Sequence, residues 1–242
     1  MLLRFLINAS LSFALFCTCL MFSWFVWSQN NFLFNQLYEY NQLEEHIEKY
    51  APQNRNRDNF ETTTKEDRVR VFGEIVDAIN NNGFGLQDIV YMADSGEIID
   101  KFLTKDEIDH LNDVSGLIKN INEANIYLIA ILAAIILFCW IYKVRKAKYF
   151  WKPVSVFAAF FNMIVLLAAG CSMVFAIGPQ NVFYFLHEWF FADKAQWHFY
   201  FQDSLMTTLL PEPIFGSIAV LLATTAFLFW IILANLIMKA LK

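Results

Sequence analysis

Four long runs of uncharged, largely apolar residues limit the fold of this chain more than any other feature. They cover residues 5–27, 124–142, 154–177 and 214–238. A helix needs about 20 residues to cross a hydrocarbon core of roughly 30 Å, so each run is long enough to span a membrane. Of the 242 residues, 57% are hydrophobic and only 17% are charged, which is more apolar surface than a soluble domain hides. The sequence therefore predicts an all-α integral membrane protein with four transmembrane helices.

Charge is distributed unevenly among the segments that flank these runs. The two chain ends and the loop 143–153 carry no Asp or Glu but eight basic residues: Arg4, Lys143, Arg145, Lys146, Lys148, Lys152, Lys239 and Lys242. The segment 28–123 holds nineteen Asp and Glu and nine Lys and Arg, a net charge of −10. Because basic flanks stay on the cytoplasmic side, we expect both termini and 143–153 inside, and 28–123 and 178–213 outside. The acidic outer segment argues against nucleic-acid binding.

The outer segment 28–123 is predicted to be a mostly helical domain. Apolar residues follow helical spacing over 32–47, 64–79 and 104–121, the first as a continuation of the first membrane helix and the last leading into the second. The latter two helices begin at Thr64 and Thr104, each with an acidic residue three positions later, which is the spacing of a capping box.

The second outer segment, 178–213, is dominated by aromatic residues. Ten of the nineteen residues from 183 to 201 are Phe, Tyr or Trp. Aromatic rings are favoured at the boundary between headgroups and acyl chains, so we expect this segment to lie at the membrane interface. Its polar residues are costly there and often functional, and the pattern alone supports an anchoring belt and a functional site equally.

Two of the four histidines are candidates for chemistry. His110 lies on the helix 104–121 beside Asp106 and Asp113, where a carboxylate could orient the imidazole and raise its proton affinity. The pattern also fits a histidine on the surface of an acidic domain, and it favours that interpretation over a catalytic role. His187 stands within the aromatic segment. His46 and His198 are expected to have no catalytic role.

Several chemistries lack the residues that they require. His187-Glu188 begins like a zinc-protease helix, but Phe191 stands where the second histidine is needed. The four cysteines fall within the predicted spans, and no phosphate-binding glycine loop is present. Ser95, Ser115 and Ser204 are expected to be exposed hydroxyls without a paired base. We therefore expect neither a metal nor a cofactor, and imidazole with carboxylate remains as the available chemistry.

Two motifs resemble those of one family. One motif looks like the signature of the bacterial lipoprotein intramolecular transacylases, and it comprises His187 to Phe191, Trp197-His198-Phe199, Asp203-Ser204-Leu205 and 210–215. The other, 107–114, is similar to that family's motif of a His followed three residues later by Asp-Val. The order of motifs and four-helix topology also agree. The stretch 51–103 departs from the family pattern.

The resemblance implies a reaction at the outer leaflet of the bacterial cytoplasmic membrane. Such proteins move one glycerol-linked acyl chain of a diacylglyceryl-modified lipoprotein onto the α-amino group of the same N-terminal cysteine. Their two functionally important histidines map onto His110 and His187. We expect one to act as general base and the other as acid, with direct transfer and no acyl-enzyme. The residues expected to orient these groups or bind substrate are Asp113, Asp203, Glu212, Trp189 and Trp197.

Two other classes of function are left open by the residues. A lipid-binding adaptor without chemistry would use the aromatic segment as a docking surface. A phospholipase-like hydrolase, or an intermolecular acyltransferase, would use the same imidazoles on other acceptors.

Overall fold

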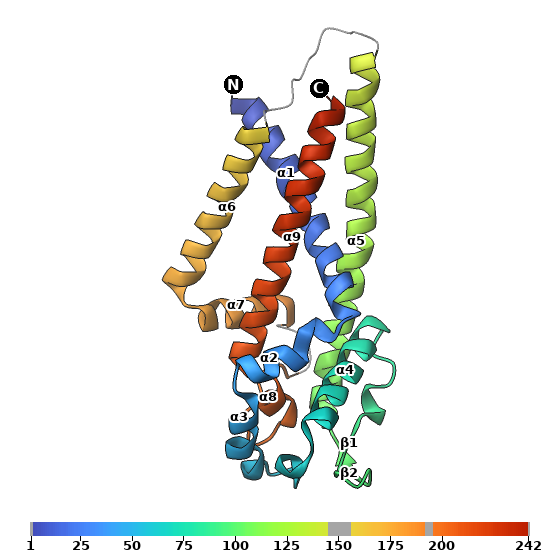
Figure 1. Cartoon of the computed structure of the whole chain (residues 1–242), viewed down its shortest axis with the longest axis vertical. Coiled ribbons are helices and arrows are strands. Elements are labelled where there is room, and N and C mark those ends of the chain that lie inside the picture. Colours follow the sequence, from blue (N-terminus) through green and yellow to red (C-terminus); the bar gives the residue numbers. More distant parts are fainter. Residues whose placement is uncertain (1, 145–155, 192–195, 242) are drawn as a thin grey trace. The chain divides into compact units, whose positions relative to one another are not determined.

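Helices make up most of the structure, a computed structural model that describes residues 2–144, 156–191 and 196–241. The elements in chain order (Figure 1) are α1 (Leu2–Ser28), η1 (Asn31–Leu33), α2 (Phe34–Tyr40), α3 (Leu43–Tyr50), η2 (Ala51–Gln53), η3 (Phe60–Thr62), α4 (Lys65–Asn80), η4 (Leu86–Asp88), β1 (Val90–Met92), β2 (Ile98–Lys101), α5 (Lys105–Val144), α6 (Val156–Ile177), α7 (Pro179–Phe191), α8 (Leu205–Leu209) and α9 (Glu212–Leu241). Of the basic residues used to predict orientation, Arg145, Lys146, Lys148, Lys152 and Lys242 lie outside the described residues.

Three helical segments are long and apolar enough to cross a membrane by length and composition: Asn8–Ser28, Lys105–Ile141 and Glu212–Ala240. A fourth candidate is a bent pair, Met163–Ile177 with Gln180–Phe191. The bend falls at Gly178, whose φ of +92° ends α6, and Pro179 opens the next helix. The prediction of a mostly helical membrane protein is confirmed, with three to four candidate spans.

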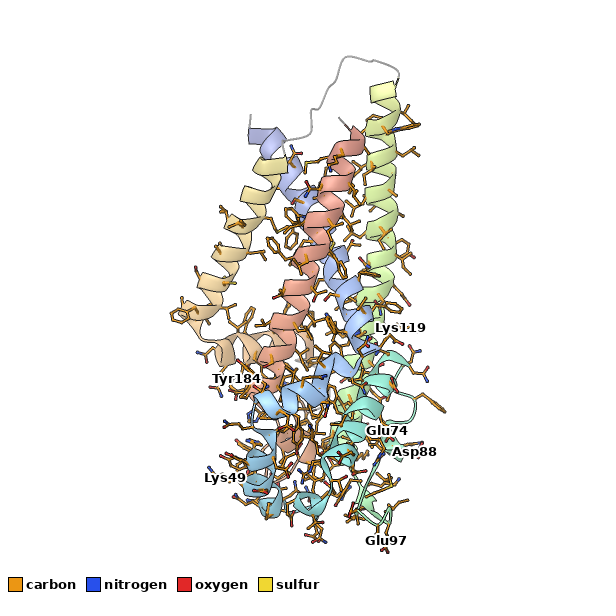
Figure 2. All side chains as sticks on the ribbon, viewed as in Figure 1. Lys49, Glu74, Asp88, Glu97, Lys119 and Tyr184 are labelled. Carbon is orange, nitrogen blue, oxygen red and sulfur yellow. The ribbon has the colours of Figure 1, made fainter. Side chains whose placement is uncertain are left out.

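The chain divides into two compact units, of which the first comprises Met1–Phe25, Asn122–Val182 and Leu222–Lys242. Its core joins α1, α6 and α9 through buried Cys19, Met163, Ala226 and Trp230. Two polar links tie α1 to α9, because Trp230 Nε1 donates to Ser12 O at 3.2 Å and Ser23 Oγ donates to Leu222 O at 3.1 Å. Hydrocarbon side chains project along α5, α6 and α9 (Figure 2), as expected for helices that lipid surrounds.

The second unit comprises Val26–Ile121 and Phe183–Leu221. It carries most of the charged side chains, including the labelled Lys49, Glu74, Asp88 and Glu97 (Figure 2). Its buried core is rich in stacked and edge-on rings: Phe34 with Phe72, Phe60 with Tyr91, and Phe60 with Phe102. The helix predicted from Thr64 is present as α4, and the Thr64 hydroxyl accepts a hydrogen bond from the backbone N–H of Asp67 at 3.2 Å.

The prediction of one helix over 32–47, continuous with the first membrane helix, is wrong. The helix ends at Ser28, and Asn31, Phe32 and Leu33 all have φ between 47° and 56°. A second break falls at Gln42, with φ of 52°, between α2 and α3. The left-handed turn at 31–33 is held by tertiary packing, because it buries the ring of Phe32 and sets Asn31 against Gly73 of α4.

A short antiparallel hairpin in the outer domain was not predicted. β1 and β2 pair Val90 with Lys101 and Tyr91 with Asp100, with a register irregularity between Tyr91 and Met92. Tyr91 is fully buried, and its hydroxyl donates to Asp58 O at 2.7 Å. The hairpin lies directly before α5, the helix that carries His110, in the chain.

Candidate active site

α5 begins with a capping box that the sequence predicted. The backbone N–H of Thr104 donates to Glu107 Oε2 at 2.6 Å, and the N–H of Glu107 donates to Thr104 Oγ1 at 3.4 Å. These bonds satisfy donors that a helix start otherwise leaves open. His110 follows one turn later, in the charged stretch 105–123 that precedes the apolar stretch 124–142.

His110 is buried among aromatic rings. Only 6% of the residue is exposed, and its ring centroid lies 5.2 Å from that of Phe191 and 5.9 Å from that of Phe199. Among the described residues, its buried Nδ1 has no hydrogen-bond partner. The expectation that favoured a surface position for this histidine is wrong. A buried polar atom without a partner is costly, so it marks a place that a ligand could complete.

His187 lies on α7 and is held by its own helix. Its Nδ1 is 2.9 Å from the carbonyl oxygen of Phe183, one turn earlier. A carbonyl only accepts, so Nδ1 carries the proton and the lone pair of the neutral ring lies on Nε2. The rings of Phe183, Trp197 and Phe191 surround it at centroid distances of 3.9, 5.3 and 5.5 Å.

The structure brings the two histidines together within the second unit. Their ring centroids are 6.0 Å apart, and the ring planes are tilted by 34°. We call His110 and His187 the histidine pair. It is lined by the rings of Phe191, Phe199 and Trp197. The result is two imidazoles in a shell of aromatic side chains at one end of α5.

Burial sets the protonation of His110, which lies in the charged start of α5, before the apolar stretch 124–142. Desolvation, and then the neighbouring His187, lower the pKa of His110 to about 4, against a smaller opposing effect of Asp113. The His110 imidazole is therefore neutral near pH 7, the form in which a ring nitrogen accepts a proton.

The other residues predicted for the site are placed less closely. Asp113 is near enough to His110 to affect its pKa. The Asp203 carboxylate pairs with Arg55 at 3.4 Å, with both side chains substantially exposed. Glu212 is exposed in the first turn of α9. Trp197 contacts the His187 ring, whereas Trp189 is 70% exposed.

Two of the three serines expected to be exposed are buried instead. Ser115 donates to Ile79 O at 2.7 Å. Ser204 is fully buried and donates to Glu107 Oε1 at 2.5 Å. The capping-box spacing identified Glu107, but it gave no sign of the bond to Ser204, since the two are far apart in sequence.

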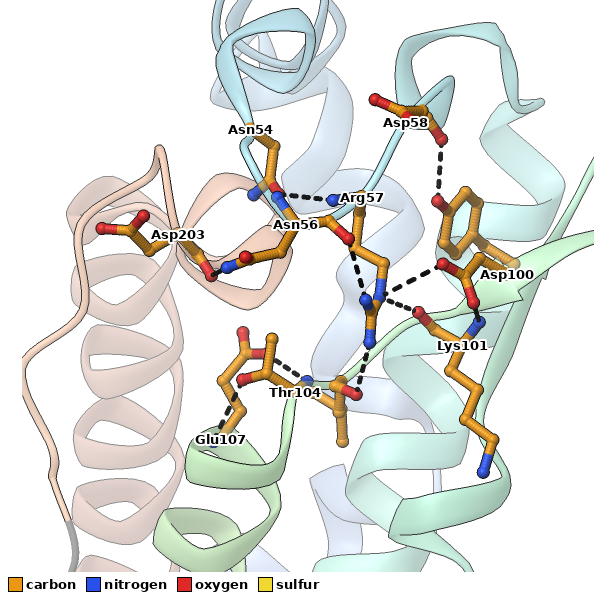
Figure 3. A network of polar contacts seen from close by, with 11 residues as sticks. Asn54, Asn56, Arg57, Asp58, Asp100, Lys101, Thr104, Glu107 and Asp203 are labelled. Carbon is orange, nitrogen blue, oxygen red and sulfur yellow. Dashed lines mark hydrogen bonds and ion pairs between the residues drawn. The ribbon is translucent and has the colours of Figure 1, made fainter.

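A network of polar contacts fixes the backbone around this site (Figure 3). Arg57 donates to the carbonyl oxygens of Lys101 and Leu103, directly before α5, at 2.5 and 3.3 Å. The neighbouring Asn56 donates to the carbonyl oxygen of Asp203 at 2.9 Å. One loop therefore holds both the start of α5 and the end of the aromatic stretch 196–203.

No group of three or more His, Cys, Asp or Glu side chains in the described ranges 2–144, 156–191 and 196–241 is arranged to hold a metal ion. What the described side chains offer near the histidine pair is two imidazoles and aromatic walls. Such a site suits proton transfer in a place that excludes water.

Comparisons with known proteins identify the family and the fold of this chain. The model of the family described as lipoprotein intramolecular transacylase Lit matches residues 9–215. Among solved structures, the membrane integral lipoprotein intramolecular transacylase Lit from Bacillus cereus, in a variant with one histidine replaced by arginine, matches with a TM-score of 0.59. The match has 15% sequence identity and covers 97% of this chain and 90% of that chain, so it shows a shared fold. A search of curated proteins finds no match. Since the family model covers most of its length, the chain belongs to the lipoprotein intramolecular transacylase (Lit) family of membrane acyltransferases.

Proposed function

We propose that the histidine pair catalyses the transfer of one glycerol-linked acyl chain of a diacylglyceryl-modified lipoprotein to the α-amino group of the same N-terminal cysteine. The observation that carries this proposal is the 6.0 Å separation of two buried imidazoles that come from different helices. Family membership supplies the substrate class, a bacterial lipoprotein. The basic flanks of the apolar runs support a site that faces the outer leaflet, with both chain ends in the cytoplasm.

The reaction needs one proton removed and one proton delivered. The neutral amine attacks the ester carbonyl carbon, a C–N bond forms, and the nitrogen loses a proton. The C–O bond to glycerol then breaks, and the departing oxygen gains a proton. Amine and ester belong to one molecule, so the protein has to hold them together and exclude water. No net proton is consumed, so two imidazoles can return the ring protons to their starting places.

The hydrogen bonds of the two rings support different roles. His187 has its Nδ1–H engaged by Phe183 O, which leaves Nε2 to accept the proton from the attacking amine. His110 is neutral, and its unpartnered Nδ1 is the buried polar atom that the substrate would complete. We assign His187 as the base and His110 as the group that protonates the departing glycerol oxygen, with the proton then restored to His110 from His187.

The hydrogen bonds of the buried Ser204 hydroxyl favour direct acyl transfer over a mechanism with an acyl-enzyme intermediate. Ser204 bonds to a carboxylate, but its Oγ already donates to Glu107 and accepts from the backbone N–H and the hydroxyl of Thr207, both at 3.0 Å. A hydroxyl with these three bonds and no exposure is a structural group. Detection of a stable acylated form of the protein would overturn direct transfer.

The experiment follows the acyl chain on a reporter lipoprotein. Transfer within one molecule leaves the mass unchanged, but an amide survives mild alkali and an ester does not. After alkali, the N-terminal peptide of the reporter should therefore retain one acyl chain. A mixture of reporters with deuterated and ordinary acyl chains should give no crossed products.

Matched variants test the assignment of the two histidines. His110→Gln and His187→Gln should each lower the transfer rate by roughly 10²- to 10⁴-fold, the usual contribution of general acid–base catalysis. The control is His46→Gln, because His46 lies on α3 and its ring contacts that of Tyr50, away from the histidine pair. Full activity in either of the first two variants would contradict the assignment, and release of free fatty acid by the parent protein would instead indicate a hydrolase.

A further inference from the structure

Glu107 has an unusual position for an acidic residue. It lies on α5 one turn before His110 and is fully buried. Its Oε2 accepts from the backbone N–H of Thr104 at 2.6 Å. Its Oε1 accepts from Ser204 Oγ at 2.5 Å and from the backbone N–H of Met206 at 3.3 Å. An acidic side chain is rarely this buried unless its oxygens are satisfied, as they are here.

All three partners of this carboxylate are donors. The two backbone N–H groups cannot accept, and Ser204 Oγ already accepts from the N–H and the hydroxyl of Thr207. A glutamine at this position would have one acceptor oxygen and would turn an NH₂ group toward a donor. The site therefore requires two acceptor oxygens, not merely a polar residue of that size.

The bonds of Glu107 join the start of the helix that carries His110 to a segment that carries part of the aromatic shell. Ser204 caps α8 and directly follows the stretch 196–203, which presents Trp197 to His187 and Phe199 to His110. Thr104 directly precedes α5, the helix that presents His110 itself. Glu107 thus connects the backbone on which His110 stands to the backbone on which the two rings stand.

We infer that Glu107 is a positioning residue that, through Ser204 and Met206, holds the aromatic stretch 196–203 closed over the histidine pair. The inference rests on the proposed function, since it assigns a role in the same site. Glu107 touches neither the reacting atoms nor the substrate. Its effect is on the enclosure that keeps water from the ester while the amine attacks. Loss of that enclosure gives water access to the same carbonyl.

The test compares Glu107→Gln with a matched variant, Asp67→Asn. Asp67 occupies the same capping-box position at the start of α4, is 8% exposed, and also accepts a backbone N–H from another segment, that of Met92 at 3.0 Å. Both variants therefore lose a buried anchor in the second unit, and Asp67→Asn also weakens the ion pair of Asp67 with Arg70. Only Glu107 is joined to the stretch that covers the histidine pair.

Two readouts distinguish positioning from general support of the fold. At a temperature where thermal unfolding shows both variants to be folded, Glu107→Gln should transfer acyl chains about 10- to 100-fold more slowly, and Asp67→Asn at nearly the parent rate. Glu107→Gln should also release free fatty acid that the parent protein does not. Ser204→Ala should reproduce both effects and Ser204→Thr, which keeps the hydroxyl, should restore transfer.

Equal losses of transfer in Glu107→Gln and Asp67→Asn, with no change in the ratio of amide to free fatty acid, would overturn the positioning role. Failure of the proposed function would look different. In that case the parent protein itself would form no alkali-stable amide, or the two histidine variants would keep full activity, whatever Glu107→Gln does.

Discussion

The imidazoles of His110 and His187 lie 6.0 Å apart, and the proximity of His187 contributes to the lowered pKa of His110. A first proton on either ring makes a second one on its neighbour less favourable. Two protonated rings at this separation are therefore disfavoured. A pair of this kind accepts a proton from one reactant and returns it to another without accumulating charge, as acyl transfer between two groups of one substrate requires.

Acid should destabilise the protein through His110. Its pKa is about 6.5 in an unfolded chain and is lowered to about 4 in the fold, so the folded state favours the neutral ring. This contribution to stability is fully present above pH 6.5 and is lost as pH falls from 6.5 toward 4. The melting temperature in detergent should fall over that range, and less steeply in His110→Phe. An equally steep fall in His110→Phe would contradict this assignment.

The two tryptophans predicted for the site should behave differently. Trp197 lies 5.3 Å from the His187 ring, whereas Trp189 is 70% exposed on α7. Trp197→Ala removes a wall of the site and should lower acyl transfer by about tenfold or more, with Trp197→Phe less affected. Trp189→Ala should mainly weaken the interfacial anchoring of α7 and leave transfer in detergent near the parent rate. Initial rates of alkali-stable amide formation measure both, and a larger loss for Trp189→Ala would contradict this placement.

Much of the site followed from sequence because its chemistry depends on few residue types. With no cysteine outside the apolar runs and no metal motif, His110 and His187 were the candidates that remained, and the family motifs supported both. The burial of His110 could not be predicted. The burial of His110 depends on Phe191 and Phe199, which contact it from other segments. The spacing of apolar residues within α5 does not indicate these contacts.

In the fold too, features set by local sequence were predicted and features set by tertiary contacts were not. Apolar length predicted the long helices, and Thr64 and Thr104 predicted where α4 and α5 begin. The break after Ser28 was missed because apolar spacing continues through 32–47, although the consecutive Asn30 and Asn31 are typical of a helix end. The bond from Ser204 to Glu107 joins residues distant in sequence, which no local pattern reports.

Asp203 should contribute through its backbone more than through its carboxylate. The carboxylate pairs with Arg55 at the surface, where such pairs contribute about 0–1 kcal/mol, while the carbonyl oxygen accepts from Asn56 in the loop network. Asp203→Asn should therefore leave acyl transfer within about twofold of the parent rate, and Arg55→Ala should do the same. Asn56→Ala should cost more stability, because a bond that anchors the aromatic stretch is lost. Abolished transfer in Asp203→Asn alone would instead support the prediction that this carboxylate orients a catalytic group or binds the substrate.

Two helical glycines should respond in opposite ways to added side chains. A Cβ on Gly73 of α4 would lie 2.9 Å from Asn31 Nδ2, in the turn whose φ values are left-handed, whereas a Cβ on Gly116 of α5 would meet nothing within 4 Å. Gly116→Ala should stabilise the protein by about 1 kcal/mol, because alanine loses less backbone entropy in a helix. Gly73→Val should destabilise it by about 1–3 kcal/mol, since the turn at 31–33 has to move. Unfolding followed by the loss of helical circular dichroism measures both, and a Gly73→Val protein as stable as its parent would show that this turn is not tightly held.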